Sequence, residues 1–336
     1  MSQPLVVIDA DVLGRRRTGD ETYVQRLLEA LPAAAAGLRL AAITRRPDLV
    51  PAGVEPIELS GRLQELRMAV RVPLLLRRLR PALVHFVHSF PLALPGRGVL
   101  TVQDLSFERD ASLMGRRETA IFKLVVPRSA RQARRVLAIS QRTKDDLVEL
   151  YGLPPEKVVV TPLAYDPDFR PGPPRDDFLL LVGAVEQRKN PLLAADAAAA
   201  VGRRLVVVGP KRDAALVEEL RRRGADVRGF VPKAELVRLY QRAAGLLFPT
   251  RYEGFGLPIA EAMACGTPVV ASPDAAVREV GGDAVAYAEP ASFAETVARV
   301  LAEPEVWSRA GLERARLFSW AETARRTADV YRDALA

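Results

Sequence analysis

The chain has 336 residues, of which 49% are hydrophobic and 27% charged, a composition typical of a soluble globular protein and not of a disordered one. Its single cysteine excludes a disulfide framework and a cysteine-based zinc site. The sequence contains no run of about 18 apolar residues, so we expect no membrane-spanning helix. We expect a cytoplasmic protein without a leader, because the first apolar run, residues 5–10, has the length of a strand.

The net charge is +8, and the excess lies in the first half of the chain. Residues 1–165 contain 25 Lys and Arg against 17 Asp and Glu, whereas residues 166–336 contain 24 of each. An anionic membrane surface or an anionic acceptor would complement this charge, and an arginine-rich composition without a partner is the alternative. We expect no nucleic acid as partner, since no nucleic-acid module, lysine-rich tail or set of stacking aromatics accompanies the charge.

Apolar runs of strand length alternate with helix-length segments twice along the chain. The expected strands are 5–10, 38–44, 83–87, 99–103, 136–139 and 158–161 in the first half, and 178–182, 205–208, 226–228, 245–248, 268–271 and 284–287 in the second. Such alternation predicts an α/β fold of two Rossmann-like domains, each with a parallel sheet covered on both faces. Residues 166–177 contain four prolines and a glycine, a composition typical of a linker.

Two basic segments, 62–80 and 116–135, have the pattern of amphipathic helices. In the first we expect one face to carry the apolar residues and the arginines to lie elsewhere. The apolar residues are Leu63, Leu66, Val70, Leu74 and Leu75, and the arginines are Arg67, Arg71, Arg77, Arg78 and Arg80. The simpler interpretation is a surface helix whose arginines lie along apolar surface. The alternative is a contact with anionic lipid headgroups or with a lipid-linked substrate.

The segment with the most chemical information is EGFGLPIAEAMACGTPVVAS, residues 253–272. Glu253 and Glu261 are eight residues apart, and a glycine-rich loop separates Glu253 from a helix that Pro258 can open. Backbone amides and a helix N-terminus suit a pyrophosphate. Carboxylates suit the hydroxyl groups of a sugar or a ribose, because these donate hydrogen bonds to them.

A second candidate segment is LLLVGAVEQRKN, residues 179–190. A strand ends at Gly183, and Arg188 and Lys189 follow before a helix. Two cations at such a turn can neutralise a diphosphate leaving group through charge-assisted hydrogen bonds. A solvated helix start is the alternative interpretation.

Segment 253–272 resembles the Glu-x7-Glu signature of glycosyltransferase family 4, the large retaining family with the GT-B fold, and family-like segments recur in order along almost the whole chain. The resemblance implies two Rossmann-like domains facing across a cleft: 1–165 for the acceptor and 166–318 for the nucleotide sugar, with helix 319–336 packing back on the first. It implies that Glu253 contacts the donor sugar, that Glu261 binds the ribose, and that cations replace a metal ion at the diphosphate. We therefore expect no metal and no cofactor besides the donor substrate.

The resemblance also names residues outside the two glutamates. It implies catalytic roles for Arg188 and Lys189 at the leaving group. The further donor-binding candidates are Gly19, Gly183, Val231, Gly254, Phe255, Gly256 and Leu257. The candidates for acceptor binding are Arg15, Arg16, Arg17, His88 and Asp104.

One position departs from the family pattern. The family has Thr-x-His-Asp-Leu where this chain has TVQDL, residues 101–105, so Gln103 stands in place of a histidine that bonds a sugar hydroxyl. Glutamine can form that hydrogen bond but cannot carry a charge. His85 or His88 could substitute in space, and a core or loop role for both is the alternative. The Asp9-x-Asp11 pair is a weaker candidate, for a metal.

These observations predict a retaining, metal-independent hexosyltransferase. It would move a mannosyl or glucosyl group from a nucleoside-diphosphate sugar to a hydroxyl of a glycan, lipid-linked or polyol acceptor. A peripheral contact of the basic first half with the inner face of a membrane is an open expectation. The alternative from another class is a degenerate binding or scaffold subunit, suggested by Gln103. A nicotinamide-dependent dehydrogenase is disfavoured, because no G-x-G-x-x-G follows the first strand.

Overall fold

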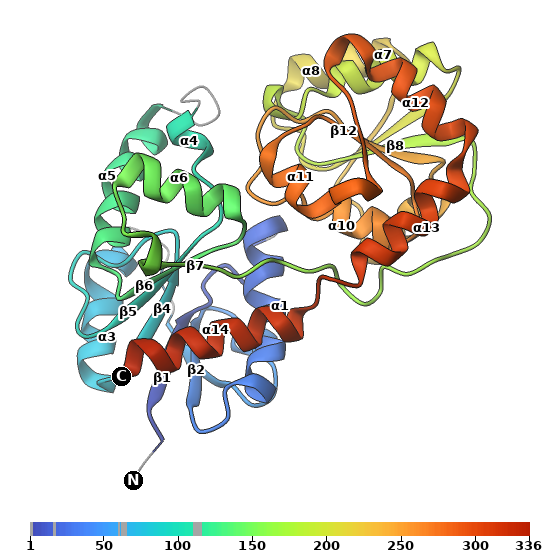
Figure 1. Cartoon of the computed structure of the whole chain (residues 1–336). Coiled ribbons are helices and arrows are strands. Elements are labelled where there is room, and N and C mark those ends of the chain that lie inside the picture. The colour runs from blue at the N-terminus through green and yellow to red at the C-terminus, as the bar shows by residue number, and fades with distance from the viewer. Residues whose placement is uncertain (1–2, 16–17, 60, 62–65, 110–115) are drawn as a thin grey trace. The chain divides into compact units, whose positions relative to one another are not determined.

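The structure is a computed structural model that describes residues 3–15, 18–59, 61, 66–109 and 116–336. The chain forms two compact units, one of Met1–Leu163 with Ser319–Ala336 and one of Ala164–Phe318 (Figure 1). Both are α/β units with parallel sheets, in agreement with the expected fold class. Residues 166–177, expected as a linker, belong to the second unit.

Within the described residues, the first unit has a seven-stranded parallel sheet in the order β3-β2-β1-β4-β5-β6-β7. The strands are β1 (Leu5–Asp9), β2 (Arg39–Thr44), β3 (Glu55–Glu58), β4 (Leu83–Val87), β5 (Gly98–Val102), β6 (Arg135–Ala138) and β7 (Val158–Val160). The strand order reverses between β1 and β4, and in open α/β sheets ligands bind at the carboxyl ends of the strands beside such a reversal. The edge strand β3 was not predicted, because its side chains are mostly exposed and form no apolar run.

Helices cover both faces of this sheet. On one face lie α3 (Val72–Leu79), α5 (Arg116–Gln132) and α6 (Gln141–Tyr151), which pack with Val84 and Phe86 of β4 in one core. On the other face α1 (Thr18–Ala34) and α14 (Trp320–Leu335) lie side by side (Figure 1). His85, between the two core residues of β4, points to that opposite face and bonds Tyr331 of α14. The short α4 (Ser106–Arg109) follows β5.

The segment before α3 differs from the sequence-based prediction. Residues Arg67–Arg71 form a π-helical turn that continues into α3. Arg67, expected at the surface, is fully buried, whereas Leu66, Val70 and Leu74 are exposed. The physical reason is an ion pair, since Nη2 of Arg67 lies 2.5 Å from Oδ1 of Asp9 at the end of β1. Val72 and Leu76 of α3 are buried in the core and Leu75 packs against it, so apolar contacts hold the helix together with this ion pair. Leu63 lies outside the described residues.

The second unit has, within the described residues, a six-stranded parallel sheet in the order β10-β9-β8-β11-β12-β13. Its strands are β8 (Phe178–Val182), β9 (Arg204–Val208), β10 (Asp226–Gly229), β11 (Gly245–Phe248), β12 (Val269–Ala271) and β13 (Ala286–Tyr287). Its helices are α7 (Pro191–Ala200), α8 (Ala214–Arg222), α9 (Lys233–Arg242), α10 (Leu257–Ala264), α11 (Ala275–Gly281), α12 (Phe293–Ala302) and α13 (Pro304–Ala315). The order reverses between β8 and β11, so the loops after these two strands flank the expected ligand position.

Candidate active site

The loop after β8 carries two cations to the reversal point of the second sheet. β8 ends at Val182, and a 3-10 turn, Gln187–Lys189, presents Arg188 and Lys189 just before α7. Gly183 has φ +148°, and a Cβ there would lie 3.4 Å from the Lys189 side chain. The positive φ favours glycine, and the distance is an ordinary van der Waals contact, so Gly183 lies directly beside the lysine.

The loop after β11 supplies the other half of the candidate site. Glu253 is followed by Gly254–Gly256 and then by α10. Phe255 is buried against Phe318, with ring centroids 5.8 Å apart, so its side chain belongs to the core. Gly256 adopts φ +103°, which glycine does without strain. Backbone amides in such a loop before a helix suit a phosphate group.

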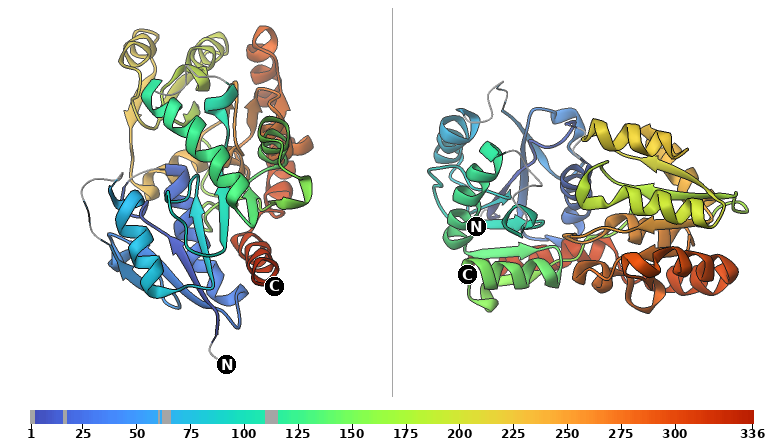
Figure 2. Two further views of the ribbon diagram at one scale, coloured as in Figure 1. Left: turned by 90° about the vertical axis from the view of Figure 1, so that its left-hand side faces the viewer. Right: turned by 90° about the horizontal axis from the view of Figure 1, so that it is seen from above.

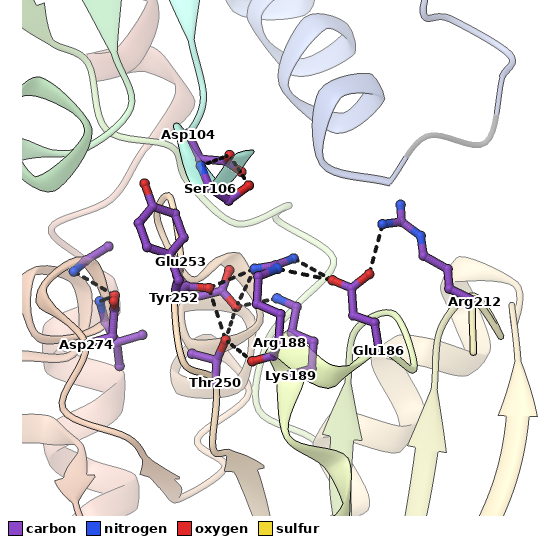
Figure 3. Close-up of polar contacts among 12 residues, drawn as sticks. Asp104, Ser106, Glu186, Arg188, Lys189, Arg212, Thr250, Tyr252, Glu253 and Asp274 are labelled. Carbon is purple, nitrogen blue, oxygen red and sulfur yellow. Dashed lines mark hydrogen bonds and ion pairs between the residues drawn. The ribbon is translucent and has the colours of Figure 1, made fainter. Parts of the chain in front are cut away.

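Glu253 is the centre of a polar cluster (Figure 3). Its Oε1 accepts hydrogen bonds from Nζ of Lys189 and, at 2.8 Å, from Oγ1 of Thr250, and it lies 3.5 Å from Nη1 of Arg188. Burial alone would raise the pKa of Glu253, but the two positive charges and the hydrogen bonds outweigh burial and hold the pKa below its usual value. The carboxyl group is therefore charged at neutral pH and fixed in direction.

Arg188 joins the two loops. Its Nη1 donates to the carbonyl oxygen of Tyr252 at 2.8 Å, directly before Glu253. Its Nε and Nη2 donate to Oε1 of Glu186 at 3.1 and 2.9 Å, and the other oxygen of Glu186 pairs with Arg212 at 3.0 Å (Figure 3). The sequence-based prediction missed Glu186, and the signal that could have found it is a carboxylate two residues before a candidate cation.

Glu261 lies in α10 and is 9% exposed. The hydroxyl of Tyr240, on α9, donates to its Oε2 at 2.7 Å. Burial raises the pKa of Glu261 to about 7, and the hydrogen bond from the tyrosine opposes that rise. The carboxyl group is thus half-titrated near neutral pH, a property that the sequence did not indicate. Tyr240 was also missed, since nothing in the sequence relates α9 to this glutamate.

The turn between β10 and α9 contains Val231, the candidate for contact with the nucleotide base. Val231 is half-buried, and the neighbouring Phe230 is 54% exposed. Lys233, at the start of α9, forms ion pairs of 2.7 Å with Asp166 and 2.5 Å with Asp168. These pairs tie residues 166–168 to α9, so the lysine has a structural role in this unit.

In the first unit, Gly19 and Gln103 lie close together at the carboxyl edge of the sheet. A Cβ on Gly19 would be 3.7 Å from Oε1 of Gln103. Gln103 is buried, and its Nε2 has no hydrogen-bond partner within the part of the chain that the structure describes. An unpaired buried donor costs about 1–3 kcal/mol, so this amide is suited to an acceptor atom of a ligand. The next residue, Asp104, accepts from the amide of Ser106 at 2.9 Å and so starts α4.

The two histidines have different environments. His85 is buried and bonds Tyr331 at 2.6 Å and Thr101 at 2.7 Å, and burial lowers its pKa to about 3. It is a core residue, as the alternative interpretation had it. His88 is half-buried, has φ +65° and lies 3.2 Å from Oδ1 of Asp20 on α1. Of the two, His88 is therefore the one placed near the start of α1 and Gly19.

The aspartates at the end of β1 are paired with arginines. Asp11 lies 2.8 Å from Arg15, 2.9 Å from Arg45 and 3.4 Å from Arg67, which also pairs with Asp9. Among the described residues, no group of three or more His, Cys, Asp or Glu could hold a metal ion. The candidates Arg16 and Arg17 lie outside the described residues.

Two family models match the chain in succession. Residues 17–169 match Glycosyltransferase Family 4, and residues 176–303 match Glycosyl transferases group 1. A D-inositol 3-phosphate glycosyltransferase of Frankia alni is 35% identical over 293 residues, which cover 75% of this chain and 69% of that protein. The chain belongs to glycosyltransferase family 4. The resemblance first noted in segment 253–272 is thereby confirmed.

Further comparisons agree with this assignment. The O-antigen chain mannosyltransferase B of Escherichia coli is 29% identical over 267 residues, 70% of each protein. The solved structure of a sucrose-phosphate synthase from Thermosynechococcus elongatus has the same fold, with a TM-score of 0.78 at 19% identity over 98% of both chains. This family 4 member is a glycosyltransferase with the two-domain GT-B fold and uses a nucleotide sugar.

The part of the chain that the structure describes contains no helix long and apolar enough to cross a membrane. Leu257, the remaining donor candidate, opens α10 and is half-buried. The structure thus brings Gly183, Arg188, Lys189, Glu253 and the loop 254–257 together at one edge of the second sheet, and Gly19, Gln103 and His88 at one edge of the first.

Proposed function

We propose that this glycosyltransferase transfers a mannosyl or glucosyl group from a nucleoside-diphosphate sugar to a hydroxyl group, with retention at the anomeric carbon and without a metal ion. The observation that carries the proposal is the cluster of Lys189, Arg188 and Thr250 around Glu253, directly before the amide-rich loop that opens α10. The mannosyltransferase among the relatives supports the choice of a hexosyl donor.

Each part of the donor has a matching group in the second unit. Glu261 accepts hydrogen bonds from the ribose hydroxyls, and the turn at Val231 contacts the base. The amides of Gly254–Gly256 and the ammonium of Lys189 bind the diphosphate, and Gly183 lies directly beside the lysine. A lysine has three N–H donors, so Lys189 can donate to a phosphate oxygen and keep its hydrogen bond to Glu253.

Arg188 acts differently from Lys189 in this proposal. Its guanidinium holds Glu186 and the carbonyl of Tyr252, and so fixes the loop that carries Glu253. We therefore assign it a positioning role and a long-range charge toward the diphosphate. The neutralising contact itself comes from Lys189 and the amides, which is why the chemistry needs no metal ion and no cofactor.

Retention follows from a front-side displacement. The acceptor hydroxyl approaches on the face from which the diphosphate leaves, and the leaving phosphate oxygen takes the proton of that hydroxyl. Glu253 is held by a lysine and a threonine, so it suits electrostatic stabilisation of the positive charge that develops on the sugar ring. A double displacement would instead need a carboxylate free to attack the anomeric carbon.

The acceptor belongs to the first unit. Gln103, whose Nε2 has no partner among the described residues, contacts the sugar being transferred, whereas His88 and Asp104 contact the acceptor. Arg15, Arg16 and Arg17 are proposed to contact an acceptor that is anionic. The acceptor classes are a glycan, a lipid-linked glycan or a polyol, and the names of two relatives, which contain O-antigen chain and inositol phosphate, agree with this range. Peripheral contact with an anionic membrane through the basic first unit is part of the proposal, and nucleic acid is not.

The decisive experiment has two stages. GDP-, UDP- and ADP-sugars are screened for an increase in Tm, and the one that stabilises the protein is incubated with glycan, lipid-linked and polyol acceptors. NMR of the product then gives the anomeric configuration. An inverted product would refute the retaining mechanism. Stabilisation by a nucleotide sugar without transfer to any acceptor would favour the degenerate binding subunit.

A further inference from the structure

A groove in the second unit is lined by arginines that the candidate active site does not use. Its volume is about 370 Å³, within the range of about 300–1,000 Å³ that is typical of small-molecule sites. It follows one side of α13, which Figure 2 shows in orange-red at the outer side of this unit in both views. The charged and hydroxyl-bearing residues that line it are Arg175, Glu305, Ser308, Arg309, Glu313 and Arg316.

The groove lies at the edge of the second sheet that is opposite to the candidate active site. Arg175 precedes β8, and its Nη2 donates to the carbonyl oxygen of Gly266, which precedes β12. Lys189 and Glu253 instead follow the carboxyl ends of β8 and β11. All strands of this sheet are parallel, so residues before the strands and residues after them lie at opposite edges. A ligand in the groove is therefore separate from the donor.

Arg175 is half-buried and forms no ion pair among the residues that the structure describes. Its Nη2 also donates to Oγ of Ser308 at 3.0 Å. Its Nε is buried and has no hydrogen-bond partner in the described part of the chain. Burial lowers the pKa of Arg175, and the negative charge of Glu305 opposes that change. A buried donor without an acceptor is unfavourable, so this guanidinium favours a ligand with acceptor oxygens.

The segment that carries Arg175 is held in place by its neighbour. The amide of Asp176 donates to the carbonyl oxygen of Arg242 at 2.6 Å, and Nε of Arg242 donates to Oδ2 of Asp176 at 2.6 Å. Arg309 and Arg316 are seven residues apart, which places them on the same side of α13. Both are exposed, and neither forms an ion pair within the described ranges. The groove thus presents three arginines that no described carboxylate pairs with.

We propose that the groove is an effector site for a phosphate monoester that carries hydroxyl groups, such as a sugar phosphate. The phosphate is mostly a dianion at neutral pH, and guanidinium groups bind its oxygens through charge-assisted hydrogen bonds. Glu305 and Glu313 repel a ligand with further negative charge, but they accept hydrogen bonds from hydroxyl groups. The groove therefore favours a small polyhydroxylated monoester over a polyphosphate. This site goes beyond the proposed function, which assigns no ligand to this edge of the sheet.

Hydrogen bonds connect the groove to Glu261. Gly266, the acceptor for Arg175, precedes Thr267, whose Oγ1 donates to the carbonyl oxygen of Tyr240 at 2.5 Å. The hydroxyl of Tyr240 donates to Glu261 at 2.7 Å. A ligand that fixes Arg175 also fixes the Gly266–Thr267 turn, so less order has to be gained when the donor binds and the affinity for the donor rises. This effect rests on the proposed role of Glu261 at the ribose, whereas binding of the monoester does not.

The test of binding is isothermal titration calorimetry of the full chain with glucose 6-phosphate, inorganic phosphate and glucose. We expect glucose 6-phosphate to bind, inorganic phosphate to bind more weakly and glucose not to bind, because phosphate and hydroxyl groups both contribute. Arg309→Gln with Arg316→Gln removes two charged donors at exposed positions and should weaken binding of glucose 6-phosphate roughly tenfold or more. Lys189→Ala, which removes the phosphate contact proposed for the active site, should bind glucose 6-phosphate like the wild type.

The matched control is Arg238→Gln with Arg299→Gln, two exposed arginines of α9 and α12 that do not line the groove. It should bind glucose 6-phosphate like the wild type, and circular dichroism melts show that each variant is folded. The effector role is tested by the affinity for the nucleoside diphosphate with and without glucose 6-phosphate. We expect a rise of about fivefold or more, which the groove variant Arg309→Gln with Arg316→Gln loses.

Several results would overturn the proposal. Binding to the groove is refuted if glucose 6-phosphate does not bind, if the groove variant binds like the control, or if Lys189→Ala abolishes binding. Inorganic phosphate that binds as tightly as glucose 6-phosphate refutes recognition of the hydroxyl groups. An unchanged affinity for the nucleoside diphosphate refutes the effector role. If no nucleotide binds at all, the proposed function and the effector role both fail, while the titration with glucose 6-phosphate still decides whether the groove binds a monoester.

Discussion

Lys189 donates a hydrogen bond through Nζ to Oε1 of Glu253, and this contact joins the loops after β8 and β11 at the point where the strand order reverses. The two residues are 64 apart in sequence and both are largely buried. Burial lowers the pKa of Lys189, although the charge of Glu253 pulls it upward. Because the buried lysine and glutamate are paired with one another, neither is an isolated buried charge before the donor binds.

Removal of the lysine should therefore affect diphosphate binding strongly. Lys189→Ala deletes a charged hydrogen bond and leaves Glu253 without its nearest cation, so we expect affinity for the nucleoside diphosphate to fall about tenfold or more. Arg188→Ala should weaken binding by a similar factor, through disorder of the Tyr252–Glu253 loop. Arg188→Lys should not restore it, because lysine lacks the planar guanidinium that bonds Glu186 through two nitrogens and Tyr252 through a third. Isothermal titration calorimetry measures the affinity of each variant for the nucleoside diphosphate. Unchanged affinity in both alanine variants would remove these residues from the mechanism.

Substitutions of Glu253 and Glu261 should change different kinetic constants. Glu261 is proposed to hold the ribose, which does not change during the reaction, so Glu261→Gln should raise KM with little change in kcat. Glu253 is proposed to face the sugar that develops positive charge. Glu253→Gln keeps its shape and deletes its charge, and should lower kcat by an amount on the order of 10²–10³. Steady-state kinetics on one donor separate the two. Opposite effects would mean that the roles are reversed, and two unimpaired variants would place the active site elsewhere.

Metal independence is testable without mutation. Lys189 and the loop amides are proposed to neutralise the diphosphate, so activity should survive an excess of EDTA. Product formation is measured with and without the chelator, and again after addition of magnesium or manganese. Activity that is lost with EDTA and restored by either ion would contradict the proposed leaving-group stabilisation.

Gln103 offers a separate test in the first unit. Its buried Nε2 has no partner among the described residues, and a hydroxyl of the donor sugar would supply one. Gln103→Ala should lower kcat modestly, whereas Gln103→His, which restores the family residue, should keep the enzyme active or raise its rate. Turnover of both variants is compared at saturating donor. An alanine variant with wild-type kinetics would show that this position lies outside the site.

Most strands of both sheets were predictable, because a parallel sheet buries both faces and its strands are continuous apolar runs. Phe178–Val182 and Gly245–Phe248 match the prediction to the residue, while β3 was missed since it is an exposed edge. The burial of Arg67 was not predictable from helical periodicity. Its partner Asp9 is 58 residues away, and no local pattern reports such a pairing.

Within the candidate site, residues that belong to a sequence motif were predictable. Residues that reach the site only through tertiary contacts were not. Glu253, Glu261 and Lys189 stand in recognisable segments. Tyr240 reaches Glu261 from another helix, and Thr250 reaches Glu253 through the geometry of the loop after β11. The raised pKa of Glu261 depends on burial, so it too required the structure.

That raised pKa predicts how donor binding depends on pH. Burial raises the pKa of Glu261 to about 7, so the carboxyl is mostly protonated at pH 6 and mostly charged at pH 8. Ribose hydroxyls donate to the charged form, so the affinity for the nucleoside diphosphate should fall as the pH falls through 7, by about tenfold between pH 8 and pH 6.

Glu261→Gln cannot titrate and should lose this dependence. Tyr240→Phe removes the hydrogen bond that opposes the rise, so its midpoint should move to higher pH. Calorimetry measures the affinity at several pH values across this range. The second phosphate of the nucleotide also ionises in this range, and the Glu261→Gln curve is used to correct for that ionisation. An identical pH dependence in wild type and Glu261→Gln would show that this carboxyl does not bind the ribose.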